Sequence, residues 1–572
     1  MNYYCNPLNV NYRYQVPKKT GDGQQGPAWR EAADPSMIYF KGSYYIFASM
    51  TLGVWVSKDL AHWENHPLPE ELPLYDYAPD VRVMGDYVYF CASRVFKNCD
   101  RYRTKDIING PYEKIPGNFF YWDPNLFIDD DGRVYFYWGC SSEEPIFGTE
   151  LDPETMLPKG EKKCLIYGCP ETRGYERVGE DNSVNAHGKE DRPYVEGAWM
   201  DKHEGKYYLQ YAFAGTEYNT YGDGVYVGDS PLGPFKPQKN NPYSYHPGGF
   251  MPGAGHGSTM KDMSENLWHT ATMRISMNHI FERRVGLWPA GFDGDGELYC
   301  NQRFGDWPRR ITGEKQDPWE EPEWMLLSLN KQVCASSEAD GCPATNAVNE
   351  NVQNWWKPSV CDRTQWLLLD LGETFTVHGI QINFADDQLK LPCRDESKGI
   401  TRFIEDRVYP VQWKLLGSED GENWFVIEDK SRAATDLTHD FIICEAGLSL
   451  RFLKLTDMSV PYGQMPCISG LRVFGKGCGP KPSPAAFEAV RVNDLDMDVE
   501  ILESNSDAPG QRALGYEILW GHAPDKLYHS RTLFGQKVRI GALVKGEAYY
   551  LRVDAFNENG ITHGSIKKLS NK

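Results

Sequence analysis

The feature that most constrains the fold of this chain is a segment that recurs five times in its first half. Each copy has a polar residue and a short apolar strand, then a turn with Gly or Asn, then a second strand rich in aromatic residues. The copies are ADPSMIYFKGSYYIFAS from Ala33, APDVRVMGDYVYFCAS from Ala78, DPNLFIDDDGRVYFYWG from Asp123, EGAWMDKHEGKYYLQYA from Glu196 and GHGSTMKDMSENLWHTATM from Gly255. Such repeated strand pairs, with outer-strand pieces such as VWVSKDLAHWENHP between them, predict a five-bladed β-propeller rather than the unrelated hairpins of a sandwich.

The second half of the chain lacks this repeat but keeps short alternating strands, as in QWLLLDLGETFTVHGIQINFAD and YEILWGHAPDKLYHSR. A linker rich in Gly and Pro, GKGCGPKPSPAAF, separates two such regions. We therefore expect an all-β protein with a five-bladed β-propeller at residues 1–325 and β-sandwich domains at residues 326–478 and 479–572.

The repeat also predicts where the functional groups lie. A propeller places the start of every innermost strand around one central channel, so polar residues at that point of each copy gather at one mouth. These residues are Asp34, Asp80, Asp123, Glu196 and His256. Asp80 is expected either to contact substrate hydroxyl groups or to cap its own turn.

Carboxyl groups on different blades can face each other across such a mouth. One protonated and one ionised carboxyl group are the minimum apparatus for hydrolysing a glycosidic bond, because the first protonates the leaving oxygen and the second activates water. A separation of about 6.5–9.5 Å leaves room for that water and gives inversion. A third carboxylate nearby raises the pKa of the acid by like-charge repulsion and keeps it protonated near neutral pH.

Over roughly residues 25–312, the chain resembles glycoside hydrolase family 43 in these motifs. The resemblance implies that Asp34 in AADPSMIYF is the general base, Glu196 in YVEGAWM the general acid and Asp123 in YWDPNLFIDDDG the modulator of the acid's pKa. It implies an inverting exo-glycosidase that removes terminal α-L-arabinofuranosyl or β-D-xylosyl residues from plant-type oligosaccharides. The alternatives are an exo-galactosidase of the same fold and a non-catalytic carbohydrate-binding propeller, which would be expected to lack one of the three carboxylates.

The same resemblance suggests residues that bind an ion or the substrate. His256 in PGAGHGSTM matches a central histidine that contacts a channel ion, often calcium, although no cofactor is expected to be required. Of the adjacent Arg283 and Arg284 in FERRVGLWP, strand alternation lets one point inward, and the resemblance favours Arg284 as the sugar contact. Tyr121 and Trp122, beside the central carboxylate of the triad, are placed to stack on a sugar ring.

A long polar segment before the general acid is expected to wall the pocket. His187, Lys189 and Arg192 in this segment are further candidates for sugar contacts.

The two rear regions resemble known modules as well. Residues 334–475, through QWLLLDLGE, QINFAD and ISGLRVFG, resemble a discoidin-like domain, in which Trp355 and Trp356 are candidate sugar contacts. This domain is equally expected to buttress the propeller. Residues 484–572 resemble a fibronectin type III domain, which implies a spacer.

Composition limits the partners. The formal net charge of −20 opposes binding to nucleic acid or to an anionic membrane, so a neutral oligosaccharide is the expected partner. The N-terminal residues show no export signal and no long apolar run follows, so a cytoplasmic location is expected, with the 14 cysteines reduced.

Overall fold

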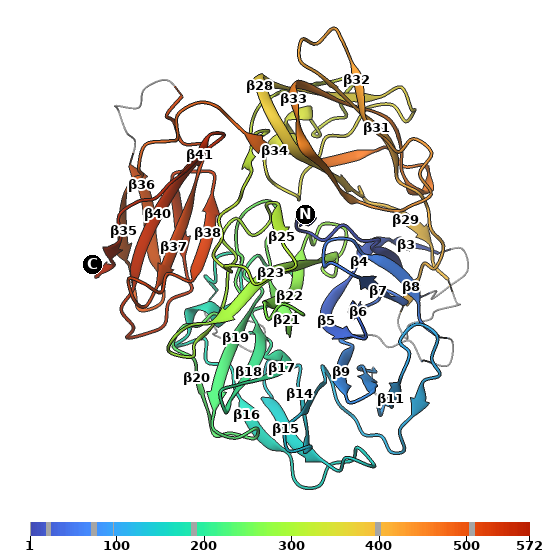
Figure 1. The fold of residues 1–572 in the computed structure, drawn as a ribbon, viewed down its shortest axis with the longest axis vertical. Helices are drawn as coiled ribbons and strands as arrows, with labels where there is room; N and C mark the ends of the chain where they lie inside the picture. Colours follow the sequence, from blue (N-terminus) through green and yellow to red (C-terminus); the bar gives the residue numbers. More distant parts are fainter. Residues whose placement is uncertain are drawn as a thin grey trace.

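The computed structural model describes residues 2–18, 24–69, 72, 77–94, 97–184, 192–394, 402–502 and 510–571. These residues form strands β1 to β43 and three short 3₁₀ helices, η1 (Gly174–Glu176), η2 (Ala344–Val348) and η3 (Pro461–Gly463). The fold is therefore all-β (Figure 1). Within the described ranges, no helix has the length and apolar character needed to cross a membrane.

Five four-stranded antiparallel sheets in the first half form the blades of a propeller, which confirms the predicted fold class (Figure 1). Each blade runs outward from the inner strand that carries the repeated motif. Blade 1 is β5 (Ala33–Phe40), β6 (Ser43–Ser49), β7 (Gly53–Ser57) and β8 (Glu64–Pro67); blade 2 is β9 (Asp80–Met84), β10 (Tyr87–Cys91), β11 (Arg101–Thr104) and β12 (Glu113–Lys114); blade 3 is β13 (Asn125–Ile128), β14 (Val134–Trp138), β15 (Ile146–Leu151) and β16 (Lys163–Ile166); blade 4 is β17 (Glu196–His203), β18 (Lys206–Phe213), β19 (Gly222–Gly228) and β20 (Phe235–Pro237); blade 5 is β21 (Gly255–Lys261), β22 (Leu267–Arg274), β23 (Arg283–Phe292) and β24 (Leu298–Cys300).

A recurring hydrogen bond joins one blade to the next. Near the start of an inner strand, a polar side chain accepts the backbone N–H of the following blade's inner strand. The pairs are Ser36 with Val81 (3.1 Å), Asp80 with Leu126 (2.7 Å), Asn125 with Met200 (2.9 Å) and Ser258 with Met37 (3.0 Å). Because these groups are buried, each bond satisfies a backbone donor that would otherwise be costly to desolvate.

Two further assemblies of strands follow the propeller. The second module comprises β26 (Met325–Leu326), β27 (Gln332–Ala335), β28 (Trp366–Ala385), β29 (Lys390–Pro392), β30 (Arg402–Ile404), β31 (Gln412–Ser418), β32 (Phe425–Asp429), β33 (His439–Ser459) and β34 (Cys467–Lys476). The third comprises β35 (Ala486–Arg491), β36 (Met497–Leu502), β37 (Gly515–Gly521), β38 (His529–Leu533), β39 (Lys537–Ile540), β40 (Tyr550–Asn557), β41 (Gly560–Thr562), β42 (Lys567–Lys568) and β43 (Ser570–Asn571).

Strands of the N-terminal segment pair both with a strand that follows blade 5 and with strands of the second module. Strand β1 (Asn2–Tyr4) pairs with β25 (Arg309–Ile311), and β3 (Gln25–Pro27) pairs with β29 of the second module. Strand β2 (Arg13–Pro17) lies between β4 (Trp29–Glu31) and β30, which forms a three-stranded sheet. One strand of the second module therefore completes a sheet that leads directly into blade 1.

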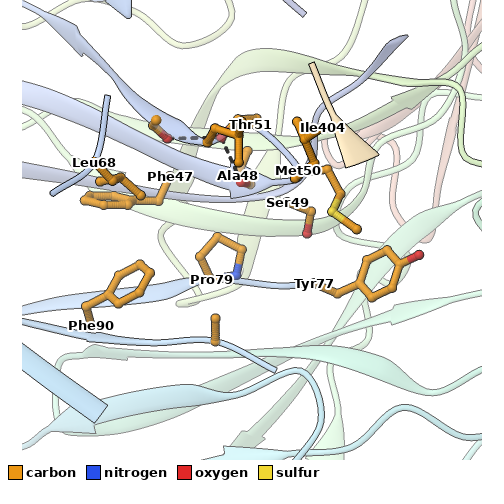
Figure 2. Close-up of a pocket in the computed structure, with 13 residues that line it drawn as sticks. Phe47, Ala48, Ser49, Met50, Thr51, Leu68, Tyr77, Pro79, Phe90 and Ile404 are labelled. Carbon is orange, nitrogen blue, oxygen red and sulfur yellow. Dashed lines mark hydrogen bonds between the residues drawn. The ribbon is translucent and has the colours of Figure 1, made fainter. Parts of the chain in front are cut away.

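A small apolar hollow lies between blades 1 and 2. Phe47, Leu68, Pro79 and Phe90 contribute apolar side chains to its lining, and Ile404 of the second module lies at one side of it (Figure 2). The second module therefore contributes to the surface of the propeller near its mouth.

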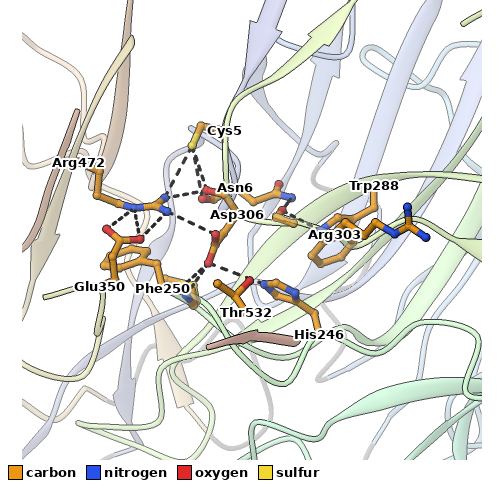
Figure 3. A network of polar contacts seen from close by, with 12 residues as sticks. Cys5, Asn6, His246, Phe250, Trp288, Arg303, Asp306, Glu350, Arg472 and Thr532 are labelled. Carbon is orange, nitrogen blue, oxygen red and sulfur yellow. Dashed lines mark hydrogen bonds and ion pairs between the residues drawn. The ribbon is translucent and has the colours of Figure 1, made fainter. Parts of the chain in front are cut away.

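A buried ionic network joins the second module to the propeller. Arg472 on β34 contacts Glu350 at 2.8 Å and the Asp306 carboxylate at 3.4 Å, and it also donates to the Asp306 carbonyl at 2.7 Å (Figure 3). Asp306 in turn accepts the backbone N–H of Phe250 and faces His246 at 3.8 Å. All these charged groups are at most 6 % exposed, so the junction depends on their mutual neutralisation.

The third module shares one continuous hydrophobic cluster with blades 3 and 4. Arg177 of the propeller side also forms a buried ion pair with Asp496 and donates to the carbonyl of Gly541 at 2.9 Å. The third module is thus packed directly against the propeller, and its expected role as a spacer stays a prediction.

The two tryptophans proposed as sugar contacts lie inside the second module. Trp356 is fully buried and donates to the carbonyl of Ser337, and Trp355 is only 9 % exposed. Neither indole presents a face to solvent, so the expectation of a sugar-stacking surface at these residues is wrong.

Candidate active site

The inner strands of three blades start from the same unusual backbone conformation. Asp34, Asp123 and His256 have φ angles of 51°, 50° and 49°, in the left-handed region that non-glycine residues rarely adopt. Their backbone N–H groups donate to side chains of the preceding blade: Thr272 for Asp34 at 2.9 Å, Ser93 for Asp123 at 3.0 Å and Asp223 for His256 at 2.7 Å. Specific hydrogen bonds thus hold the strained left-handed backbone conformation at these three residues.

The structure corrects the alignment of the five polar residues. Ala78 and Gly197 occupy the left-handed position in blades 2 and 4, with φ angles of 51° and 61°. Glu196 therefore lies one residue before this position and Asp80 lies two residues after it. Only Asp34, Asp123 and His256 share one register, so Glu196 approaches the mouth from a different point of its strand.

The imidazole of His256 links two of the predicted catalytic carboxylates. Its Nδ1 lies 3.4 Å from Asp34 Oδ1 and 3.8 Å from Asp123 Oδ2. Burial opposes a charge on the ring, but these two carboxylates raise the pKa of His256 above its usual value. A protonated His256 would lower the electrostatic cost of crowding three acids at one mouth.

Glu196 is held by two donors. The Tyr221 hydroxyl donates to Glu196 Oε1 at 2.7 Å, and the Cys140 thiol donates to Oε2 at 3.0 Å. The glycine that follows it is required sterically, since a Cβ on Gly197 would lie 2.7 Å from Cγ of His256. The Glu-Gly pair therefore places a carboxyl group and the histidine ring side by side.

Asp34 is surrounded by groups that favour its ionised form. Burial disfavours the charge, but the Arg283 guanidinium at 3.3 Å and the His256 ring hold the pKa of Asp34 below its usual value. The Ser49 hydroxyl donates to its other oxygen at 2.7 Å. A carboxylate that stays ionised in a nearly dry site suits a general base.

Asp123 behaves in the opposite way. Burial raises the pKa of Asp123 to about 8, and the nearby Glu196 and Asp34 charges add to the effect, against the opposing influence of His256. Side-chain atoms of Asp123, Cys140 and Glu196 all lie within 4.8 Å of one another, so the carboxyl group of Asp123 lies beside that of Glu196. Near neutral pH Asp123 therefore holds a proton next to Glu196.

The two adjacent arginines of β23 have roles opposite to those expected. Arg284 points away from the mouth, where its Nε donates to His439 of the second module at 2.8 Å and its Nη1 to the carbonyl of Arg30 at 2.9 Å. Arg283 points to the mouth and contacts Asp34. Strand alternation was a sound guide, but the choice of Arg284 was wrong, because the inward position falls on Arg283.

The remaining residues predicted to bind substrate lie in different environments. Tyr121 is fully buried and packs against Phe136, so it cannot stack on a sugar. Trp122 is partly exposed with its ring centroid 6.0 Å from that of Tyr77 at the mouth. The Asp80 carboxylate joins blades 2 and 3, which accounts for it without a substrate.

The polar segment before Glu196 is described in part. Arg192 is exposed and pairs with Glu171 at 3.4 Å. His187 and Lys189 lie outside the described residues.

The sequence analysis did not identify several residues that contribute to the mouth. They are Glu31, Cys140, Tyr221 and Arg402. Cys140 had only a weak signal, because it lies just after the third copy of the repeat, two residues beyond the end of β14. Arg402 carried no such signal, since it lies in another module.

The described protein groups around His256 do not by themselves supply a calcium site. Its Nδ1 faces the carboxylates of Asp34 and Asp123, Arg283 already contacts Asp34, and calcium takes roughly six to eight oxygen ligands. Below the mouth, the guanidinium of Arg82 stacks on Trp199 at 3.4 Å and donates to the carbonyl of Met200 at 3.2 Å. A side-chain cation thus reaches from blade 2 to blade 4 across the channel.

A propeller mouth lined by an ionised carboxylate, a protonated carboxyl group and a third carboxyl group beside them is the kind of site that glycoside hydrolases use. Residues 29–298 match the model of the glycosyl hydrolases family 43, and this part of the chain belongs to that family.

Individual relatives are distant. A β-D-galactofuranosidase of Aspergillus niger is 26 % identical over 244 residues, which cover 36 % of this chain and 64 % of that protein. A xylan 1,3-β-xylosidase of a Vibrio species is 26 % identical over 342 residues, or 54 % of this chain and 58 % of that protein. The chain thus spans less than two thirds of the length of these curated relatives. A solved glycoside hydrolase aligns over 77 % of this chain and 97 % of its own, with 16 % identity and a TM-score of 0.43.

Proposed function

We propose that this protein is an inverting exo-glycosidase that hydrolyses terminal α-L-arabinofuranosyl or β-D-xylosyl residues of neutral oligosaccharides. The observation that carries the proposal is the convergence of Asp34, Asp123 and Glu196 from three blades around His256 in a family 43 domain. The lowered pKa of Asp34 supports its role as the base, and the raised pKa of Asp123 supports a protonated carboxyl group beside the acid Glu196.

In this mechanism Asp34 takes a proton from water as the water oxygen attacks the anomeric carbon. Glu196 donates a proton to the glycosidic oxygen as the bond to the anomeric carbon breaks. Asp123 keeps a protonated carboxyl group beside Glu196 during the reaction. After the product leaves, Asp34 releases its proton to solvent water and Glu196 takes up a proton from solvent water, which restores the starting state. Water attack and departure of the leaving group on opposite faces invert the anomeric configuration.

An exo mode of action is supported by the burial of the carboxyl groups. Asp34 and Asp123 are only 5 % and 3 % exposed. Half-buried Trp122, Tyr77 and Phe281 lie around the mouth. Such an enclosed site suits one terminal sugar ring better than the middle of a polymer.

The choice of pentosides is supported by the names of relatives, which include several xylosidases and arabinosidases. A terminal galactofuranosyl residue is a second candidate, because a relative of known name is a β-D-galactofuranosidase. Aryl α-L-arabinofuranoside, β-D-xyloside and β-D-galactofuranoside assayed side by side distinguish these candidates.

The assignment of acid and base is tested with matched substrates. Glu196→Gln should nearly abolish hydrolysis of a natural disaccharide but retain much more activity on an aryl glycoside with an acidic phenol, because phenolate leaves without a proton. Asp34→Asn should lose activity on both substrates. Glu113→Gln, which changes an exposed carboxylate of blade 2, is the control. Rescue of Asp34→Asn, and not of Glu196→Gln, by the good leaving group would mean that the two roles are exchanged.

A further inference from the structure

We infer that Arg402, supplied by the second module, is a positioning residue of the catalytic base Asp34. The inference rests on the proposed function, because it concerns how the base of that reaction is kept ionised. It makes the second module a part of the active site.

The connection begins in the sheet that precedes blade 1. Strand β30 pairs with β2, and β2 pairs with β4, so Arg402 and Glu31 lie on strands of the same sheet. Arg402 Nη1 donates to Glu31 Oε2 at 2.8 Å across 371 residues of sequence. Glu31 is fully buried.

Glu31 is shared by two arginines. Its other oxygen, Oε1, accepts from Arg283 Nη2 at 2.6 Å, while Arg283 Nη1 faces Asp34 at 3.3 Å. Arg283 thus stands between two buried carboxylates. Arg402 supplies the second positive charge, so that two carboxylates face two guanidinium groups.

Removing the charge of Arg402 would leave Arg283 as the only arginine for both carboxylates. Glu31 makes the shorter contact, so Arg283 would be drawn toward Glu31 and away from Asp34. The pKa of Asp34 is already lowered in part by Arg402 itself, after the opposing effect of burial and the larger contributions of Arg283 and His256. Both effects would make the base harder to ionise.

The side chain of Arg402 is held in place by aromatic rings. Its guanidinium lies over the rings of Tyr77 at 5.2 Å, Trp29 at 5.3 Å and Phe281 at 5.5 Å, and it donates to the Tyr77 hydroxyl. A long apolar side chain can keep much of this packing. Arg402→Met therefore removes the charge with little change of volume, and Arg402→Lys keeps the charge.

The experiment measures the pH dependence of kcat/KM for the full chain on an aryl glycoside. Activity appears as pH rises through the pKa of the base, so a higher pKa moves the acidic limb to higher pH. Arg402→Met should move that limb upward by roughly half a unit to one unit and lower kcat about tenfold, with less effect on KM. Arg402→Lys should retain most of the wild-type profile.

Two further variants separate this effect from damage to the fold. Arg407→Met, which removes an exposed arginine of the same segment, should leave the profile unchanged. In the double variant Glu31→Gln with Arg402→Met, Arg283 again faces Asp34 as its only carboxylate, so the limb should return toward its wild-type position. This double variant also serves if Arg402→Met alone does not fold.

The outcomes distinguish the two proposals. An unshifted limb in Arg402→Met, or a limb that does not return in the double variant, overturns the role of Arg402 while Asp34→Asn remains inactive. Activity in Asp34→Asn overturns the proposed function itself.

Discussion

Gly197→Ala is the substitution that tests most directly whether the geometry around His256 controls activity. An alanine here must keep a φ of +61°, which costs roughly 1–2 kcal/mol for an L-residue. The added Cβ would also lie 2.7 Å from Cγ and 2.9 Å from Cδ2 of the His256 ring, closer than real contacts allow. The ring is packed between Asp34 and Asp123, so it can yield only by displacing a carboxylate.

Relief of this overlap requires a displacement approaching 1 Å, and errors of about that size at a reacting centre can cost roughly 100-fold in rate. We therefore expect kcat/KM to fall by about two orders of magnitude and the melting temperature to fall by a few degrees. Steady-state kinetics on an aryl glycoside and calorimetry measure the two effects on the same preparation.

Gly205→Ala is a matched control in the same blade. Gly205 has a φ of +79° in the turn between β17 and β18, and a Cβ there meets nothing within 4 Å. This variant should show a similar loss of stability with unchanged kcat/KM. If Gly197→Ala retains activity within threefold of Gly205→Ala, contact with His256 does not control the site and the reasoning fails.

Four further outcomes are expected. Asp123→Asn should move the basic limb of kcat/KM to lower pH, because the variant lacks the second carboxyl group whose negative charge opposes loss of the acid's proton; an unchanged limb would contradict this role of Asp123. Arg283→Met should raise the acidic limb, whereas Arg284→Met should lower only the melting temperature; the reverse pattern would restore the choice made from the sequence. Arg472→Met should destabilise the folded chain by about 3–5 kcal/mol in urea unfolding, because it leaves the buried Glu350 carboxylate unpaired and Asp306 without its arginine, and a change below about 1 kcal/mol would refute the importance of this buried network. Activity should survive exhaustive chelation, and a complete loss restored by calcium would count against this.

The repeated segment explains both what could be predicted from the sequence and what could not. The repeat predicts the blades and brings Asp34, Asp123 and Glu196 to one mouth, because each copy places a strand start at the channel. It does not encode one-residue offsets, so Glu196 was assigned the register of Gly197. A β-bulge follows the same point in blades 1, 4 and 5, after Ala33, Glu196 and Gly255, so the backbone irregularity itself belongs to the repeat. What differs is which position of the repeat carries the polar side chain.

Arg402 illustrates a second limit. Neither its neighbours in sequence nor any motif connects it to the mouth, and only the pairing of β30 with β2 brings it there. Arg283 and Arg284 illustrate a third limit. The alternation of side chains along a strand predicts that they point to opposite sides. Which of the two faces the mouth depends on where the second module packs.

The shared sheet of β2, β4 and β30 has a consequence for synthesis of the chain. The N-terminal strands leave the ribosome first, yet β2 lacks one of its two neighbours until Arg402 to Ile404 have been made. Pairing between strands so far apart in sequence slows folding, and until β30 is made one edge of β2 stays unpaired in the nascent chain. The propeller thus emerges before the proposed base Asp34 has all its partners, and on the proposed mechanism the newly made chain should reach full activity only when the second module has docked.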